Sequence, residues 1–208
     1  SKFESGHPII DGFVNTGERI VLTAKQKAGK TILCLQASLC VANGVSLAGM
    51  WTVPRPRKVL YVATEGSQAE LQAVLARLEA ALEVTTPSDR FSICYTPVLH
   101  LNRADDLYAD LKAQVRDFEP DLVVLDPLYR VHAGTLTDDG AVNETTSRIN
   151  MLGDRLAVII PHHNHRDRRD PHGILINEGG ESYMGSFAIA AWCTAIYNLS
   201  FSRLTKLG

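Results

Sequence analysis

A segment near the start of the chain has the residue types and spacing of a phosphate-binding loop. Residues 24–31 read Ala-Lys-Gln-Lys-Ala-Gly-Lys-Thr and follow a short apolar run at 19–23. Residues 31–43 then carry apolar side chains at helical spacing, up to Gly44. A strand, a tight turn and a helix start leave free backbone N–H groups and the positive end of a helix dipole at the turn. The pattern predicts an anion site that suits the phosphates of ATP.

Three residues of this loop have chemically distinct roles. Gly29 lets the backbone approach a phosphate closely, Lys30 can reach the β- and γ-phosphates, and the Thr31 hydroxyl can ligate Mg²⁺. Ala24 stands where the motif has its first glycine, but the groups that touch phosphate come later in the loop. A chance Gly-Lys-Thr at an exposed helix start is the alternative. The residues that we expect to contact nucleotide are Lys27, Ala28, Gly29, Lys30, Thr31 and Ile32.

Two acidic residues close other predicted strands. Asp126 follows the apolar run 121–125, and Glu65 follows the run 58–64. In open α/β sheets ligands lie at the carboxyl ends of the strands, so both carboxylates should face the phosphate loop. We expect Asp126 to hold Mg²⁺, directly or from the outer coordination shell, and Glu65 to polarise the attacking water. The alternatives are a turn aspartate before Pro127 and a glutamate at a helix start.

Adjacent histidines close the predicted strand 156–161. Side chains alternate along a strand, so His162 and His163 point in different directions. We expect one of them to face the γ-phosphate and the other to pack or face solvent. His165 and His172 follow, but no cysteine spacing supports a zinc site.

A basic stretch follows the histidines, at Arg166, Arg168 and Arg169. Residues 165–185 lack apolar periodicity, and we interpret them as loops with a hairpin around 173–177. The arginines could contact a nucleic-acid backbone, with single-stranded DNA as one candidate partner, or reach a neighbouring subunit's nucleotide as an arginine finger. A solvated charged loop is the third interpretation.

Length and composition indicate one globular domain spanning residues 1–208. The 208 residues are 45% hydrophobic and 21% charged, and the formal net charge of -2 gives no global attraction to nucleic acid. The four cysteines are scattered without a C-x-x-C pair, which favours buried thiols in a reducing compartment and a cytoplasmic location. No stretch is long and apolar enough to cross a membrane, so we expect no membrane partner.

Strand and helix patterns alternate along most of the chain. This order predicts an α/β fold with a mainly parallel sheet covered on both faces. We expect residues 187–201 to form one or two final strands. The predicted strands are 19–23, 58–64, 91–95, 121–125 and 156–161, and the predicted helices are 31–43, 68–82, 104–118 and 140–153.

With these residues in place, the chain resembles the RecA-like ATPases, and most closely the branch of RepA-type and DnaB-like hexameric helicases. The resemblance spans about residues 10–202. The matching segments are Gly17–Leu22, Lys27–Thr31, Val59–Glu65, Asp121–Leu128, Val158–His163 and Gly185–Ser186. Met184 departs from the pattern, because this branch often has arginine there, and Arg166 stands where relatives often have lysine.

The resemblance implies a RecA-like three-layer sandwich, with a mainly parallel twisted sheet, helices on both faces and C-terminal antiparallel strands. It implies Mg²⁺-dependent ATP hydrolysis as the motor of a replicative-type DNA helicase, in which Glu65 is the general base and His162 or His163 a sensor. It also implies a homo-oligomeric ring, with a hexamer as one option and nucleotide between subunits. The helicase role rests on family analogy alone.

Two other functions use the same phosphate loop. A small-molecule or nucleoside kinase would need an arginine-rich lid, for which residues 166–169 could serve. A non-hydrolysing ATP-binding regulator would use nucleotide only to control assembly. The departures from the family pattern at Ala24 and Met184 are compatible with this function.

Overall fold

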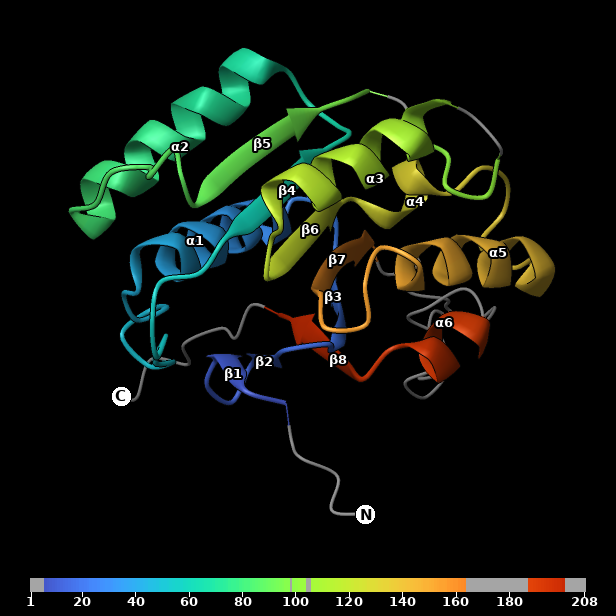
Figure 1. Cartoon of the computed structure of the whole chain (residues 1–208), viewed down its shortest axis with the longest axis horizontal. Helices are drawn as coiled ribbons and strands as arrows, with labels where there is room; N and C mark the ends of the chain where they lie inside the picture. The colour runs from blue at the N-terminus through green and yellow to red at the C-terminus, as the bar shows by residue number, and fades with distance from the viewer. Residues whose placement is uncertain (1–5, 98, 104–105, 164–186, 201–208) are drawn as a thin grey trace, which may run out of the picture.

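The computed structural model describes residues 6–97, 99–103, 106–163 and 187–200 (Figure 1). The strands are β1 Pro8–Ile10, β2 Val14–Asn15, β3 Arg19–Ala24, β4 Val59–Ala63, β5 Phe91–Tyr95, β6 Leu122–Asp126, β7 Ala157–His163 and β8 Ala195–Leu199. The helices are α1 Lys30–Asn43, α2 Gln68–Leu82, α3 Asp106–Phe118, α4 Leu128–Val131, α5 Asp139–Asn150 and α6 Phe187–Trp192.

A parallel sheet organises the fold. Its six strands run in the order β5-β4-β6-β7-β3-β8, and every adjacent pair is parallel. Strand β7 therefore lies between β3, which leads into the phosphate loop, and β6, which ends on Asp126. The carboxyl ends of these strands meet at one edge of the sheet, as the alternation of strands and helices predicts.

The expectation of C-terminal antiparallel strands is wrong. Residues 187–192 form α6, and β8 runs parallel to β3, while the antiparallel strand pair among the described residues is β1 with β2 near the N-terminus. Strands β7 and β8 lie on either side of β3 and point the same way. Helix α6 directly precedes β8, and its alanines suit a helix better than a strand.

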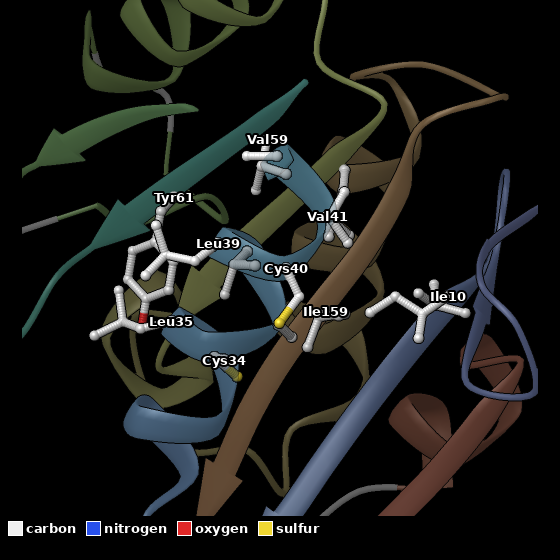
Figure 2. Close-up of a cluster of buried hydrophobic side chains, with 14 of the residues drawn as sticks. Ile10, Cys34, Leu35, Leu39, Cys40, Val41, Val59, Tyr61 and Ile159 are labelled. Carbon is white, nitrogen blue, oxygen red and sulfur yellow. The ribbon is translucent and has the colours of Figure 1, made fainter. Parts of the chain in front are cut away.

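Helices cover both faces of the sheet, which confirms the predicted layering. On one face, α1 and α2 pack on residues such as Ile20 and Leu22, and on the other α3, α4, α5 and α6 pack on residues such as Val21. Figure 2 shows α1 lying over the strands, with Leu39 of the helix near Tyr61 of β4. The alternation along β3 thus divides its side chains between two cores.

Local signals set the ends of α1 and α2. Helix α1 ends on Gly44 in the left-handed conformation, and α2 begins at a capping box in which Ser67 accepts from the Glu70 N–H and Glu70 accepts from the Ser67 N–H. Such caps satisfy backbone groups that a helix end leaves unpaired. Both ends therefore match the sequence pattern.

All four cysteines are free thiols, as their spacing predicts: Cys34 and Cys40 are buried, and Cys94 and Cys193 are half-buried. No described helix combines the length and hydropathy that a membrane span requires.

The sheet is not paired evenly along its length. The ladder between β3 and β7 runs up to Ala24 and His163, whereas the ladder between β6 and β7 stops at Val124 and Ile159. Asp126 and His163 both lie beyond that last pair. The pairing of β7 with β6 therefore ends before the strand tips, where Pro161 of β7 has no N–H to donate, whereas its pairing with β3 reaches them.

We predict that Gly44→Ala destabilises the fold more than Gly49→Ala. Both glycines have positive φ, at 71° and 68°, but a Cβ at Gly44 would lie 2.8 Å from Pro56 Cδ, whereas Gly49 has open space. Backbone strain alone should cost about 1 kcal/mol in each variant, and the contact with Pro56 should add about 1–2 kcal/mol in Gly44→Ala. Urea unfolding measures both, and equal losses would show that Pro56 moves away freely.

Candidate active site

The phosphate loop connects β3 to α1 over residues 25–29. Lys27 and Gly29 have positive φ, at 62° and 89°, and a Cβ on Gly29 would meet nothing within 4 Å. Ala24, by contrast, is the buried last residue of β3 and pairs with His163. The position that the motif gives to its first glycine is thus a strand residue here, which explains why alanine is tolerated.

Lys30 is the first residue of α1 and is only 5% exposed. Its ammonium group donates to the carbonyl oxygens of Ala24 at 2.9 Å and Lys25 at 3.0 Å. Burial lowers the pKa of Lys30, while the negative charges of Asp126 and Glu65 act in the opposite direction. The lysine is therefore held within the loop, with its charge close to two carboxylates.

Asp126 is 6% exposed at the end of β6, and hydroxyl groups surround its carboxylate. Tyr61 of β4 donates to Oδ2 at 2.5 Å. Burial raises the pKa of Asp126, and hydrogen bonds from Tyr61 and Thr31 lower it. The Thr31 hydroxyl and the Asp126 carboxylate thus lie together, as a Mg²⁺ site beside a phosphate requires.

Strand β4 is tied to the same point and carries Glu65 just beyond its end. The N–H and the hydroxyl of Thr64 both donate to the Asp126 carbonyl oxygen at 2.9 Å. Glu65 is exposed, and burial together with the nearby Glu65 carboxylate raises the pKa of Tyr129 of α4. The fold therefore brings Glu65 to the edge of the sheet that carries Asp126 and Lys30.

The adjacent histidines have different surroundings, as strand alternation predicts. His162 is 3% exposed and pairs in register with Thr23, whereas His163 is half-buried and pairs with Ala24. The His163 ring lies 5.5 Å from the Tyr129 ring. Burial lowers the pKa of His163, the Lys30 charge lowers it further, and the charges of Glu65 and Asp126 raise it.

These contacts place His163 at the same edge of the sheet as Lys30, Glu65 and Asp126. Its Nδ1 is buried and has no hydrogen-bond partner among the described residues. His163 therefore lies within electrostatic range of Lys30, Glu65 and Asp126, and the sensor role of either histidine stays a prediction.

Residue types present at the edge fit Mg²⁺ bound together with a triphosphate. Among the described residues, no three His, Cys, Asp or Glu side chains come together as a metal cluster. Magnesium in phosphoryl-transfer sites usually takes one or two protein oxygens and completes its shell with phosphate and water. Thr31 and Asp126 match that requirement.

Several sequence predictions lie outside the described residues. These are His165, Arg166, Arg168, Arg169, His172, the hairpin around 173–177, and Met184 with Gly185–Ser186. The interpretation of the basic stretch as a nucleic-acid contact or an arginine finger stays a prediction. Ile32 is described, and it lies half-exposed in the first turn of α1, next to the loop.

Sequence reasoning missed two tyrosines of the site. Tyr61 lies in the apolar run 58–64, and a tyrosine buried in a strand needs a partner for its hydroxyl group, which was a usable signal. Tyr129 carries no such signal, because its contacts with Glu65 and His163 come from elements distant in sequence.

Comparison with known proteins gives one family. A family model described as an AAA domain matches residues 1–169, which is most of the chain. A search of curated proteins finds no match.

We predict that Asp126→Asn leaves the protein at least as stable as the parent. Burial raises the pKa of Asp126, so its ionised form is unfavourable in the fold, and an asparagine Oδ1 can still accept from Tyr61. The matched variant is Asp121→Asn at the other end of β6, where the carboxylate accepts from Arg57 and the Lys58 N–H. It should lose about 1–2 kcal/mol. Urea unfolding at pH 7 measures both, and a clear loss in Asp126→Asn would contradict the argument.

Proposed function

Because the chain belongs to the AAA-domain family of P-loop NTPases, we propose that it hydrolyses Mg²⁺-bound ATP at the edge formed by Lys30, Asp126 and Glu65. The observation that carries the proposal is the convergence of these residues with His163, from separate strands and the phosphate loop. A phosphate-binding cation, a metal-binding pair, a candidate base and an imidazole then share one edge of the sheet.

Each residue has a defined task in this mechanism. The backbone N–H groups at the start of α1 and the Lys30 ammonium group hold the β- and γ-phosphates, and Thr31 and Asp126 hold Mg²⁺. Bound Mg²⁺ neutralises charge on the phosphate oxygens. Buried Lys30 and desolvated Asp126 both gain from these partners, because each is a charge whose burial is otherwise unfavourable.

Glu65 acts as the general base. The water oxygen forms a bond to the γ-phosphorus, the bond to the β–γ bridging oxygen breaks, and a water proton passes to Glu65. ADP and phosphate then leave, and Glu65 returns the proton to solvent. His163 donates a hydrogen bond to a γ-phosphate oxygen and so registers whether that phosphate is present.

We further propose that hydrolysis drives a ring-forming DNA helicase. The support is the resemblance to RepA-type and DnaB-like ATPases and the basic stretch at Arg166, Arg168 and Arg169, which follows His163 closely in sequence. When His163 loses its contact with the γ-phosphate, the resulting change in its position would be transmitted directly to these arginines. A DNA strand is the partner that its charge fits.

We predict that Glu65→Gln lowers the ATPase kcat by about 10²–10³-fold while ATP affinity stays within about twofold of the parent. Glutamine keeps the size of the side chain but cannot take a proton. Glu83→Gln is the matched control, because Glu83 is an exposed glutamate at the far end of α2. Phosphate release and equilibrium binding of a fluorescent ATP analogue measure the two quantities, and full turnover in Glu65→Gln would remove this residue from its role.

The same assay separates the candidate functions when single-stranded DNA is added. Stimulation of phosphate release by DNA supports the helicase proposal. Transfer of the γ-phosphate to a nucleoside or another small acceptor, with little release as phosphate, would instead indicate a kinase. ATP binding without turnover would indicate a regulator.

We predict that Lys30→Ala weakens ATP binding by at least about tenfold, because the variant loses the cation at the phosphates. Lys112→Ala, which removes an exposed lysine of α3, should leave binding unchanged. Isothermal titration with Mg²⁺-ATP measures both. Equal affinities in the two variants would place the nucleotide elsewhere.

A further inference from the structure

Tyr61 is a fully buried tyrosine whose hydroxyl group reaches the end of a neighbouring strand. It lies in β4, in register with Val124 of β6, and Figure 2 shows its ring beside side chains of α1 such as Leu35, in the same core. Its hydroxyl group donates to Oδ2 of Asp126 at 2.5 Å. A phenol oxygen in an apolar core needs a hydrogen-bond partner, and this bond provides it.

The same bond determines which oxygen of Asp126 is left for a cation. Its length is that of a hydrogen bond to an ionised acceptor, which is stronger than a bond between neutral groups. Tyr61 and Asp126 are both buried, at 0% and 6% exposure, so neither side chain can turn freely. With Oδ2 engaged by the phenol, Oδ1 is the oxygen left for a metal ion or for a water molecule bound to it.

A carboxylate that offers one oxygen suits Mg²⁺ better than Ca²⁺. Mg²⁺ requires a small octahedral shell with ligands at about 2.0–2.1 Å and keeps several of its water molecules. Ca²⁺ takes about 6–8 oxygen ligands at about 2.3–2.6 Å and often uses both oxygens of one carboxylate. Bidentate binding by Asp126 would compete with the hydrogen bond from Tyr61, so the structure disfavours it.

The backbone bonds at Asp126 do not set the orientation of its side chain. The N–H and the hydroxyl group of Thr64 donate to the Asp126 carbonyl oxygen at 2.9 Å, which fixes the main chain. The carboxylate could still rotate about its last bond if these were its restraints. The bond from Tyr61 acts on the carboxylate itself, and Thr64 offers a control that changes the same strand pair without touching that group.

We propose that Tyr61 is a positioning residue that presents a single oxygen of Asp126 to the cation and so makes the nucleotide site prefer Mg²⁺ to Ca²⁺. This inference rests on the proposed function, since it requires Asp126 to act on the cation, directly or through a bound water molecule. Tyr61 acts through Asp126 from within the core. Partners that orient a metal ligand typically contribute about 10–100-fold to metal affinity.

The test is Tyr61→Phe, which keeps the ring in the core and removes the hydroxyl group. Affinity for a non-hydrolysable fluorescent ATP analogue is measured in EDTA, in Mg²⁺ and in Ca²⁺, and the gain from each cation is the ratio to the EDTA value. We expect the Mg²⁺ gain to fall about tenfold, the Ca²⁺ gain to change by less than about threefold, and the EDTA affinity to stay within about twofold of the parent. An unchanged Mg²⁺ gain, or equal losses with both cations, overturns the inference.

Thr64→Val is the matched control, because it removes the hydroxyl bond to the Asp126 carbonyl oxygen and keeps the size of a side chain that is 1% exposed. Its Mg²⁺ gain should stay within about twofold of the parent. A tenfold loss in Thr64→Val would assign the effect to a general loosening of β4 and overturn the role of Tyr61. The parent protein gives a check that needs no variant to fold, since its Mg²⁺ gain should exceed its Ca²⁺ gain, and equal gains contradict the preference.

The two proposals fail in different ways. If Asp126→Asn keeps the full Mg²⁺ gain, the proposed metal role of Asp126 fails, and the inference on Tyr61 fails with it. If Asp126→Asn loses the gain and Tyr61→Phe keeps it, the proposed function stands and only the inference is lost. Full turnover in Glu65→Gln would remove the proposed base without changing the outcome of the cation experiment, which needs no hydrolysis.

Discussion

A carboxylate buried at the end of β6 constrains most of its surroundings. Asp126 cannot stay charged there without partners, and the hydroxyl groups of Tyr61 and Thr31 supply them from β4 and α1. The neighbouring backbone is tied in as well, since Thr64 donates twice to the Asp126 carbonyl oxygen. The hydrogen bonds that the buried Asp126 requires thus fix β4, β6 and the phosphate loop relative to one another. They also determine the position of Glu65, which follows β4.

Charge at this edge is balanced within a small region. Lys30, the cation of the loop, is held by backbone carbonyl oxygens and lies within electrostatic range of Asp126 and Glu65. All three charges act on His163, and burial lowers the pKa of its imidazole. The donors that would contact an incoming anion are already in position. Little therefore has to reorganise when phosphates bind.

Local signals and strand order predict most of this arrangement. Residues close together in the sequence specify the phosphate loop, the capping box of α2 and the apolar runs of β4 and β6. Parallel pairing of the strands then brings Glu65, Asp126 and His163 to one edge of the sheet. The direction of β8 could not be predicted in this way, because an apolar run does not reveal how the chain reaches it. The contacts of Tyr129 could not be predicted from the sequence either, because they depend on how α4 packs against elements that are distant in sequence.

The uneven pairing of β7 also affects how the sheet responds to force. Cross-strand hydrogen bonds give a sheet its stiffness, and those between β6 and β7 end at Val124 and Ile159, while β7 stays joined to β3 up to His163. Under load, the tips of β3 and β7 should bend as one unit and not shear past each other. A pull on the phosphate loop would thus swing His163 with it, away from Asp126, so that the most compliant line in the sheet runs through the site where a phosphate bond would be broken.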